Sequence, residues 1–170
     1  MLLYHPATDF FHCWMRFAFI LCKCGDNGIE FDRVRIIDFL LCFPQELNNC
    51  TLPVKFRQIL SQQLKQLPKT YEDPYSIRQG FAQMKKVQCQ VAMDMVAKGI
   101  VQRDAYREGV LIPRTESENV SMLLESVAQN WNVKDENLQN MTITALLSIP
   151  LNGKNGLKER SGLMEFRYDA

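Results

Sequence analysis

The chain has 170 residues, of which 46% are hydrophobic and 23% are charged. This is the composition of a folded globular protein, and the length predicts one domain over residues 1–170. Twenty Lys and Arg residues against 19 Asp and Glu residues leave a net charge of only +1, which excludes a protein that coats nucleic acid through its overall charge.

The charge is distributed unevenly along the chain. Residues 1–50 have a net charge of −2, residues 51–115 of +6 and residues 116–170 of −3. We therefore divide the chain into these three sub-regions. Only the middle one is a candidate for binding phosphate groups or an acidic partner.

Two helices are predicted in the first sub-region. Over residues 9–24 the apolar side chains occupy nearly every face, which is typical of a buried central helix, and Thr8 or Asp9 is suited to cap its start. A second helix is predicted over residues 30–42. Because the turn at residues 25–28 is short and rich in glycine, the two helices are expected to form an antiparallel hairpin.

The basic middle sub-region begins with two predicted helices, over residues 53–67 and 75–98. Residues 100–101 and 110–112 then form short apolar segments that indicate extended structure. The order helix, helix, β-hairpin is that of a winged-helix unit. A short helix over residues 103–108 is the alternative for the stretch between the two segments.

The last sub-region is predicted to contain two more amphipathic helices, one following Thr115 or Ser117 and one over residues 136–149. The tail over residues 151–170 is predicted to be mostly irregular. It carries five large apolar side chains, so it is expected to dock on the rest of the chain or on a partner. The predicted fold class is therefore mainly α: an N-terminal helical hairpin, a winged-helix-like middle with a short β-hairpin, and C-terminal helices with a docking tail.

Three charged residues interrupt the two apolar N-terminal helices. Arg16 lies in the first, and Arg35 and Asp38 lie three residues apart in the second. Charges are rarely buried unless they are paired. We predict an internal Arg–Asp latch that holds the helices together; the alternative is that these charges face a partner subunit.

Two arginines of the tail have the same two candidate roles. If the tail docks internally, Arg160 and Arg167 are expected to meet acidic groups of the N-terminal sub-region, with Asp9 and Asp38 as the candidate partners. If it docks externally, the same arginines would contact a partner.

Six basic residues of the middle sub-region are candidate contacts to DNA. In a winged-helix unit, a helix and the wing contact backbone phosphates on both sides of the groove. The alternative is a solvated basic face, the usual role of such residues. The six candidates are Lys85, Lys86, Lys98, Arg103, Arg107 and Arg114.

No catalytic, cofactor-binding or metal-binding pattern is recognised in the sequence. His12 and Cys13 are neighbours on a predicted helix and point about a hundred degrees apart, which does not suit a nucleophile and its base. Residues 153–158 lack the spacing of a phosphate-binding loop. The six cysteines lack metal-ligand spacing and indicate reduced thiols. The sequence predicts a cytoplasmic protein that is not an enzyme, has no cofactor and does not enter the membrane.

Three segments of the chain resemble a known family. They are Leu3-Tyr4-His5-Pro6-Ala7-Thr8-Asp9 with His12-Cys13 and Arg16, Phe31-Asp32-Arg33-Val34-Arg35-Ile36-Ile37-Asp38-Phe39 with Phe43-Pro44, and Gly153-Lys154-Asn155-Gly156-Leu157-Lys158-Glu159-Arg160-Ser161-Gly162-Leu163 with Phe166-Arg167-Tyr168-Asp169. Together they are similar to the middle component of ABC-three-component bacterial defence systems, the small subunit of Lamassu-type operons.

The resemblance implies a non-catalytic subunit of an anti-phage or anti-plasmid system. Such operons encode an SMC-like or Rad50-like coiled-coil ATPase and an effector that is often a nuclease. The small subunit is expected to join the ATPase heads to the effector and to contact double-stranded DNA within the complex. The alternative function is a stand-alone winged-helix transcriptional regulator that binds DNA.

Overall fold

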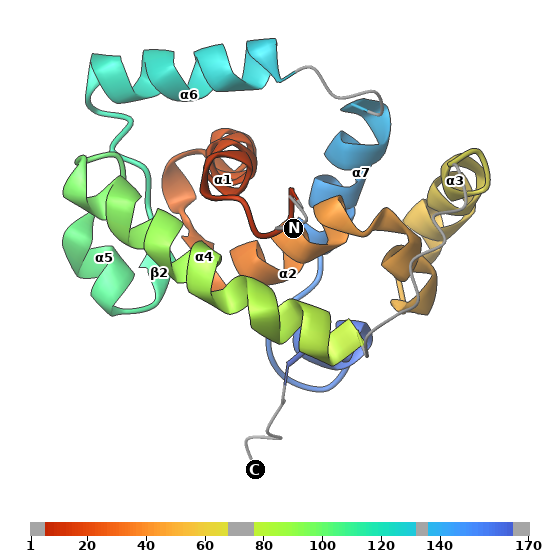
Figure 1. Cartoon of the computed structure of the whole chain (residues 1–170). Helices are drawn as coiled ribbons and strands as arrows, with labels where there is room; N and C mark the ends of the chain where they lie inside the picture. Colours follow the sequence, from red (N-terminus) through yellow and green to blue (C-terminus); the bar gives the residue numbers. More distant parts are fainter. Residues whose placement is uncertain (1–5, 68–76, 132–135, 165–170) are drawn as a thin grey trace, which may run out of the picture.

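The computed structural model describes residues 6–67, 77–131 and 136–164 (Figure 1). In chain order its elements are α1 (Phe10–Cys24), the 3₁₀ helix η1 (Gly25–Asn27), β1 (Ile29–Glu30), α2 (Phe31–Cys42), the 3₁₀ helix η2 (Pro44–Asn49), α3 (Val54–Leu64), α4 (Ile77–Ala97), α5 (Arg103–Arg107), β2 (Val110–Leu111), α6 (Glu118–Asn130), α7 (Glu136–Leu147) and α8 (Leu157–Ser161). The described residues are mainly helical with a small antiparallel sheet, which confirms the predicted fold class.

Helices α1 and α2 form the centre of the fold. Residues 17–21 of α1 and 33–41 of α2 are all buried. Helices α4 and α6 pack on α1, whereas α4 and α7 pack on α2. Helices that are apolar on nearly every face need neighbours on every side, and this arrangement supplies them.

The two central helices are consecutive and in contact, but they are not antiparallel. In Figure 1, α1 is seen end-on while α2 lies across the view, so the two helices cross steeply. The turn between them leads directly into β1. At Gly28, φ is +70° and a Cβ atom would lie 2.6 Å from Cγ1 of Ile112, so only glycine fits where this turn passes β2.

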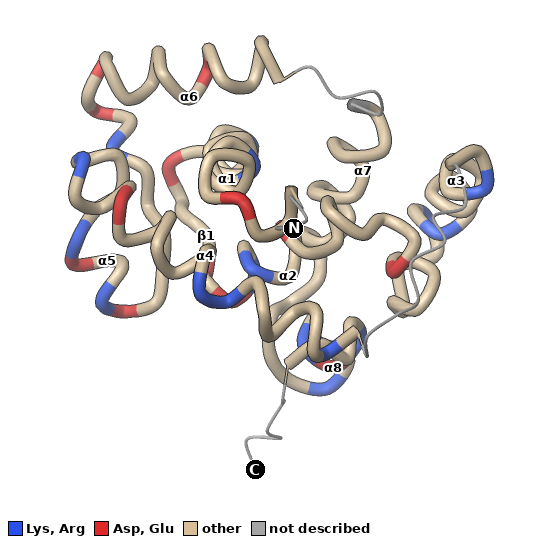
Figure 2. Tube along the Cα trace, viewed as in Figure 1, with Lys and Arg blue, Asp and Glu red and all other residues tan. Residues whose placement is uncertain are grey.

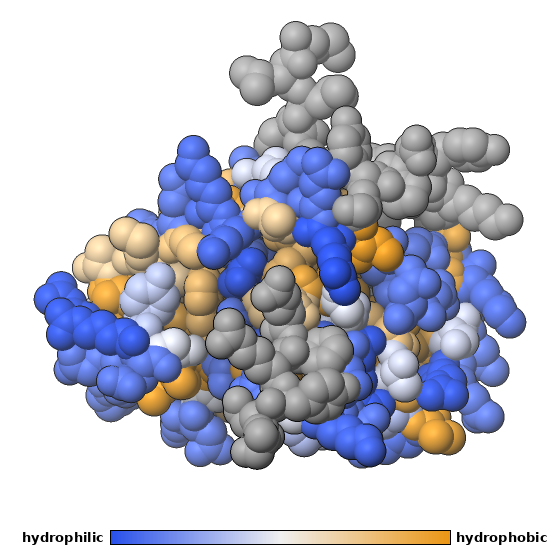
Figure 3. All heavy atoms as spheres, turned by 90° about the horizontal axis from the view of Figure 1, so that it is seen from below, coloured by the Kyte–Doolittle hydropathy of each residue, from blue (hydrophilic) through white to orange (hydrophobic). Residues whose placement is uncertain are grey.

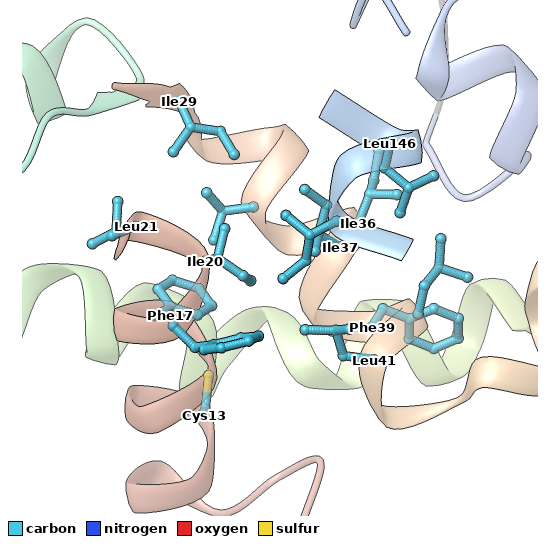
Figure 4. Close-up of a cluster of buried hydrophobic side chains, with 14 of the residues drawn as sticks. Cys13, Phe17, Ile20, Leu21, Ile29, Ile36, Ile37, Phe39, Leu41 and Leu146 are labelled. Carbon is cyan, nitrogen blue, oxygen red and sulfur yellow. The ribbon is translucent and has the colours of Figure 1, made fainter. Parts of the chain in front are cut away.

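The hydrophobic core is centred on α1 and α2 and is completed by side chains of α4, α6 and α7. Figure 4 shows Phe17 and Ile20 of α1 near Ile36 and Ile37 of α2, with Leu146 of α7 on the side of Ile36. All five side chains are fully buried. Each contributes about 1.5–3 kcal/mol relative to an exposed position.

The strand pairing differs from the predicted hairpin. Residues 110–111 pair with residues 29–30 of the N-terminal region, in the antiparallel register Ile29↔Leu111. The two segments that were predicted to pair with each other do so only at the isolated antiparallel bridge Val101↔Pro113. There the backbone N–H of Gln102 donates to the carbonyl of Ile112 at 2.9 Å, and that of Arg114 donates to the carbonyl of Ile100 at 2.8 Å. The stretch between the segments contains α5, the helix that was the alternative. The physical reason is burial: pairing with β1 places Leu111 against the central helices, where it is fully buried.

The predicted winged-helix arrangement of the middle sub-region is therefore wrong. Helix α4 packs on α1 and α2, whereas α3 packs on α7 and η2 at the other edge of the molecule (Figure 1). The middle sub-region thus shares its core with both neighbours: its helices bury their apolar sides against α1, α2 and α7.

The described part of the tail docks on the chain itself. Leu157 and Leu163 are buried, and α8 occupies part of the segment predicted to be irregular. The tail residues 165–170, which include Arg167, lie outside the described residues.

Candidate functional site

The buried charges of α1 and α2 form an internal latch. Nε of Arg16 donates to Oδ1 of Asp38 at 2.6 Å, and the two side chains are 6% and 0% exposed. Nη1 of Arg16 also donates to the carbonyl of Pro6 at 3.1 Å. Charge-assisted bonds of this length between desolvated groups fix the crossing of the two helices.

Gln88 of α4 connects the latch to a third helix. Its Nε2 atom donates to Oδ2 of Asp38 at 2.8 Å and to the carbonyl of Arg35 at 3.2 Å, while Nε of Arg35 donates to its Oε1 at 3.0 Å. Gln88 is fully buried. Arg35 therefore does not pair with Asp38, three residues away; it stacks over the Phe81 ring and forms an ion pair with Asp32 at 3.6 Å.

Burial governs the protonation of the groups around the latch. It raises the pKa of Asp38 above its usual range, while Arg16, Gln88 and Cys13 oppose that shift by hydrogen bonding to the carboxylate. Burial, together with the charge of Asp38, also raises the pKa of the Cys13 thiol, whose sulfur lies 3.9 Å from Oδ2 of Asp38. Cys13 is consequently a protonated donor to the latch, not a thiolate nucleophile.

The C-terminal region is fastened to α2 by a second set of polar contacts. Nη1 of Arg33 donates to the carbonyls of Leu146 and Ile149 at 2.9 and 2.5 Å, which satisfies the end of α7. Nζ of Lys158 lies 2.8 Å from Oδ2 of Asp32. Helices α4, α7 and α8, which are distant from one another in sequence, thus all form polar contacts with α2.

The expected partners of the tail arginines are wrong for Arg160. Its side chain donates to the backbone carbonyls of Asn155 and, at 2.8 Å, Thr51, because α8 docks beside the segment that follows η2. Asp9 instead caps α1 by accepting from the backbone N–H of His12 at 2.8 Å. Arg167 lies outside the described residues.

The six candidate DNA contacts are all exposed, but they are not equivalent. Three of them lie beside an acidic neighbour: Lys98 with Asp94, Arg107 with Asp104, and Arg114 with Glu116. Within the described part of the chain, the other three form no ion pair. These are Lys85 and Lys86 on α4 and Arg103 on α5. Figure 2 shows how positive and negative residues alternate around α5.

Sequence reasoning missed a surface at α3. Val54 and Ile59 are 74% and 47% exposed, although Ile59 follows the apolar spacing of a buried position. Beside this helix, a cleft of about 270 Å³ lies between η2 and α3. Helix α3 carries basic residues and no acidic residue (Figure 2). On the face seen from below, apolar side chains form only small separate patches among hydrophilic ones (Figure 3).

Gln88 was also missed, although the sequence contains a signal for it. The buried side of α4 runs through Phe81, Met84, Gln88, Val91 and Met95, with the spacing of one helix face. Gln88 is the single polar residue in that series. A polar side chain on an otherwise apolar helix face is expected to find buried partners.

The residues described in 6–67, 77–131 and 136–164 contain no cluster of three or more His, Cys, Asp or Glu side chains arranged to hold a metal ion. Over the same ranges, no helix combines the length and apolarity needed to cross a membrane. The described chain is a helical protein with a buried polar latch and an exposed basic helix at one edge.

Comparison with known protein families identifies the family of this protein. The chain matches the family of ABC-three component (ABC-3C) system Middle Component 5 over residues 2–169. It therefore belongs to this family, which makes it a defence-system subunit with protein partners. No curated protein and no solved structure matches the chain.

Proposed function

We propose that the protein is the non-catalytic small subunit of a Lamassu-type complex in the cytoplasm. In this proposal it joins an SMC-like or Rad50-like coiled-coil ATPase to an effector nuclease that acts against phage or plasmid DNA. Membership of the middle-component family supports a role among several subunits. The resemblance of three segments to the small subunit of such operons supports the identity of the partners.

The observation that carries the bridging role is that large apolar side chains are exposed at separate places on the molecule. Val54 and Ile59 are exposed on α3, and Met122 and Leu123 are exposed on α6 at 61% and 39%; Phe10, Phe11 and Met93 are exposed as well. Figure 1 shows these helices at different edges of the molecule. Exposed apolar groups that gather on one element mark interaction sites, and two such sites far apart suit two partners.

Contact with double-stranded DNA inside the complex has separate support. Lys85, Lys86 and Arg103 are exposed and make no ion pair within the described residues. With a net charge of +1 for the whole chain, such a small set gives weak binding by itself. Its effect would be felt once the other subunits hold the protein near the duplex.

The test is to co-express the components of the native operon and to measure the mass of what co-purifies. We expect the ATPase and the effector to associate only when the small subunit is present. The variants Val54→Ser/Ile59→Ser and Met122→Ser/Leu123→Ser should each remove a different partner.

Two results would contradict the proposal. One is equal association of the ATPase and the effector without the small subunit. The other is ATP hydrolysis, DNA cleavage or proteolysis by the purified protein at rates well above those of a mock preparation.

A further inference from the structure

Three Asn-Gly pairs occur in the chain, all at turns of the described structure. They are Asn27-Gly28 after α1, and Asn152-Gly153 and Asn155-Gly156 in the loop between α7 and α8. In an Asn-Gly pair the glycine nitrogen can attack the asparagine side chain with little hindrance, because glycine has no Cβ to keep the two groups apart. The three pairs have the same chemistry, so their surroundings decide which of them reacts.

The peptide group between Asn155 and Gly156 is held at both ends. Its carbonyl accepts from Nε of Arg160, and its N–H donates to the carbonyl of Gly153 at 2.9 Å. Gly156 is also buried. A backbone nitrogen must lose its proton before it attacks, and an N–H that is buried and hydrogen-bonded loses the proton less easily.

The pair Asn27-Gly28 is confined in another way. Asn27 is the last residue of η1, and Gly28 is half-buried. A Cβ added at Gly28 would lie 2.6 Å from Cγ1 of Ile112 and 3.0 Å from the carbonyl oxygen of Leu111. Ring closure requires the peptide group to swing toward the asparagine side chain, and close packing on β2 and Ile112 opposes that movement.

The pair Asn152-Gly153 has neither constraint. Both residues are exposed, and a Cβ added at Gly153 would meet nothing within 4 Å. Within the described residues, neither the carbonyl of Asn152 nor the N–H of Gly153 forms a hydrogen bond. This peptide group is therefore open to solvent and free to turn.

We propose that Asn152 is a site of spontaneous deamidation that loosens the docking of α8. The nitrogen of Gly153 gives up its proton and forms a bond to Cγ of Asn152, while the side-chain amide nitrogen leaves with that proton as ammonia. Water then opens the cyclic imide. Cleavage between the Gly153 nitrogen and Cγ gives aspartate, whereas cleavage between that nitrogen and the main-chain carbonyl carbon gives isoaspartate.

The isoaspartate form conflicts with the way the loop is closed. The N–H of Leu157 donates to the carbonyl of Pro150 at 2.7 Å, and that of Lys158 donates to the carbonyl of Leu151 at 3.2 Å. Both bonds span Asn152, and isoaspartate adds a methylene to the main chain between them. The carbonyl of Asn152, which lies against the N-cap of α8, also becomes a free carboxylate. The added length and charge both oppose the two closing hydrogen bonds.

The experiment ages the purified full chain in mildly alkaline buffer, digests it in acid and measures conversion of each amide to an acid by mass spectrometry. Asn152 should react roughly 2–12-fold faster than Asn155, the factor by which one hydrogen bond changes a rate, and faster than Asn27 as well. Asn152→Gln is the matched control and should stay unmodified at this position, because its longer side chain closes a larger ring less readily. Equal rates at the three pairs, or a faster reaction at Asn27 or Asn155, would overturn the assignment.

Hydrogen exchange measured on aged protein reports the effect on α8. The backbone amides of Leu157 and Lys158 should exchange at least about threefold faster in the isoaspartate form, separated by chromatography, than in fresh protein. Asn152→Asp adds charge without the extra methylene and should remain close to wild type. Unchanged exchange in the isoaspartate form would contradict the effect on α8. Equal exchange in Asn152→Asp and in the isoaspartate form would overturn the argument from chain length.

Discussion

Replacement of Gln88 by leucine is the most direct test of the latch. Leucine has nearly the volume of glutamine, so the change removes hydrogen bonds without opening a large cavity. Gln88 makes three hydrogen bonds, two as donor and one as acceptor. Gln88→Leu leaves Oδ2 of Asp38 with only the weak thiol donor of Cys13, and it leaves Nε of Arg35 without the acceptor that the glutamine supplied.

The expected loss of stability is large. An unmade hydrogen bond costs about 1–3 kcal/mol per buried group, and more when that group is charged. Asp38 is fully buried and Arg35 is 8% exposed, so neither gains much from water in compensation. We expect Gln88→Leu to lower the free energy of unfolding by about 2–5 kcal/mol, because two buried charged groups each lose a hydrogen-bond partner while the Arg16–Asp38 pair remains. Against a typical total of about 5–15 kcal/mol, this is a large fraction.

Urea denaturation followed by far-UV circular dichroism measures the effect. The midpoint should fall while the slope of the transition stays the same, which indicates a change in stability and not in the unfolded state. Gln90→Leu, at an exposed position of the same helix, is the control and should change stability by less than about 0.5 kcal/mol. A loss below about 1 kcal/mol for Gln88→Leu would refute the argument that these bonds hold α4 in place.

Three further predictions concern other polar and thiol groups. Hydrogen bonding to Arg33 lowers the pKa of Glu30 from 4.5, so the ionised side chain stabilises the fold above pH 4.5, and this stabilisation is lost as the pH falls through the lower pKa of the folded state. The difference in stability between wild type and Glu30→Gln, measured by thermal melts, should therefore close in acid. A difference that widens in acid would contradict this. Oε1 of Gln63 is buried with no hydrogen-bond partner in the described structure, and its Nε2 atom donates only a weak bond to Sδ of Met141 at 3.8 Å. Gln63→Leu should therefore leave the melting temperature unchanged or raise it, with a stability gain of up to about 1 kcal/mol, and a clear decrease would contradict this. Burial raises the pKa of Cys42 and of Cys50 to about 12, so iodoacetamide at pH 8 should alkylate both far more slowly in the native protein than in urea, as followed by mass spectrometry, and equal rates would disprove it.

The central part of the fold is readable from the sequence because its signals are local. Apolar residues on nearly every face of the helix predicted over residues 9–24 indicate burial without knowledge of its neighbours. Arg16 and Asp38 stand out in the two central helices because a buried charge needs an opposite charge nearby. That rule predicts that each buried charge has a partner, but it does not predict which residue the partner is. Arg35 shows this, because it contacts Gln88 and Asp32 and not Asp38.

The strand pairing could not be predicted from the sequence, because the two paired segments are distant in sequence and each is very short. β2 is two residues long, and its partner β1 lies about eighty positions earlier, where Ile29 and Glu30 also fit a helix start. Short segments of this kind have no pattern that specifies register, so the surrounding helices decide the pairing. The predicted hairpin is therefore reduced to the bridge Val101↔Pro113, because residues 110–111 pair with β1 instead.

Ile59 shows a third limit of sequence patterns. Its spacing places it with the buried residues of α3, yet the structure leaves it 47% exposed, because within the described residues α3 packs mainly on α7 and η2. Periodicity predicts the side of the helix on which a side chain lies, but it does not predict whether another element packs on that side. An apolar position that the fold leaves uncovered is therefore visible only after the helices have been placed.

The six basic residues of the middle sub-region can be ranked by the same reasoning about partners. Lys85 and Lys86 form no ion pair within the described residues, whereas Lys98 lies 2.7 Å from Asp94 and is already partly neutralised. If the assembled complex binds DNA through this face, Lys85→Glu/Lys86→Glu removes two phosphate contacts. Each contact changes the slope of log K against log salt concentration by about 0.9, so the slope should flatten by about 2.

Fluorescence anisotropy with a labelled duplex, over a series of salt concentrations, measures this slope for the complete complex. Lys98→Glu is the matched control, and its effect should be smaller because Asp94 already offsets its charge. An ion pair that is exposed contributes little to stability, so both variants should fold and assemble normally. If the slope is unchanged in Lys85→Glu/Lys86→Glu, these lysines do not contact phosphate, and α4 presents a solvated basic face. If Lys98→Glu has the larger effect, the ranking by ion pairing is wrong, because the pair with Asp94 would then have to open when DNA binds.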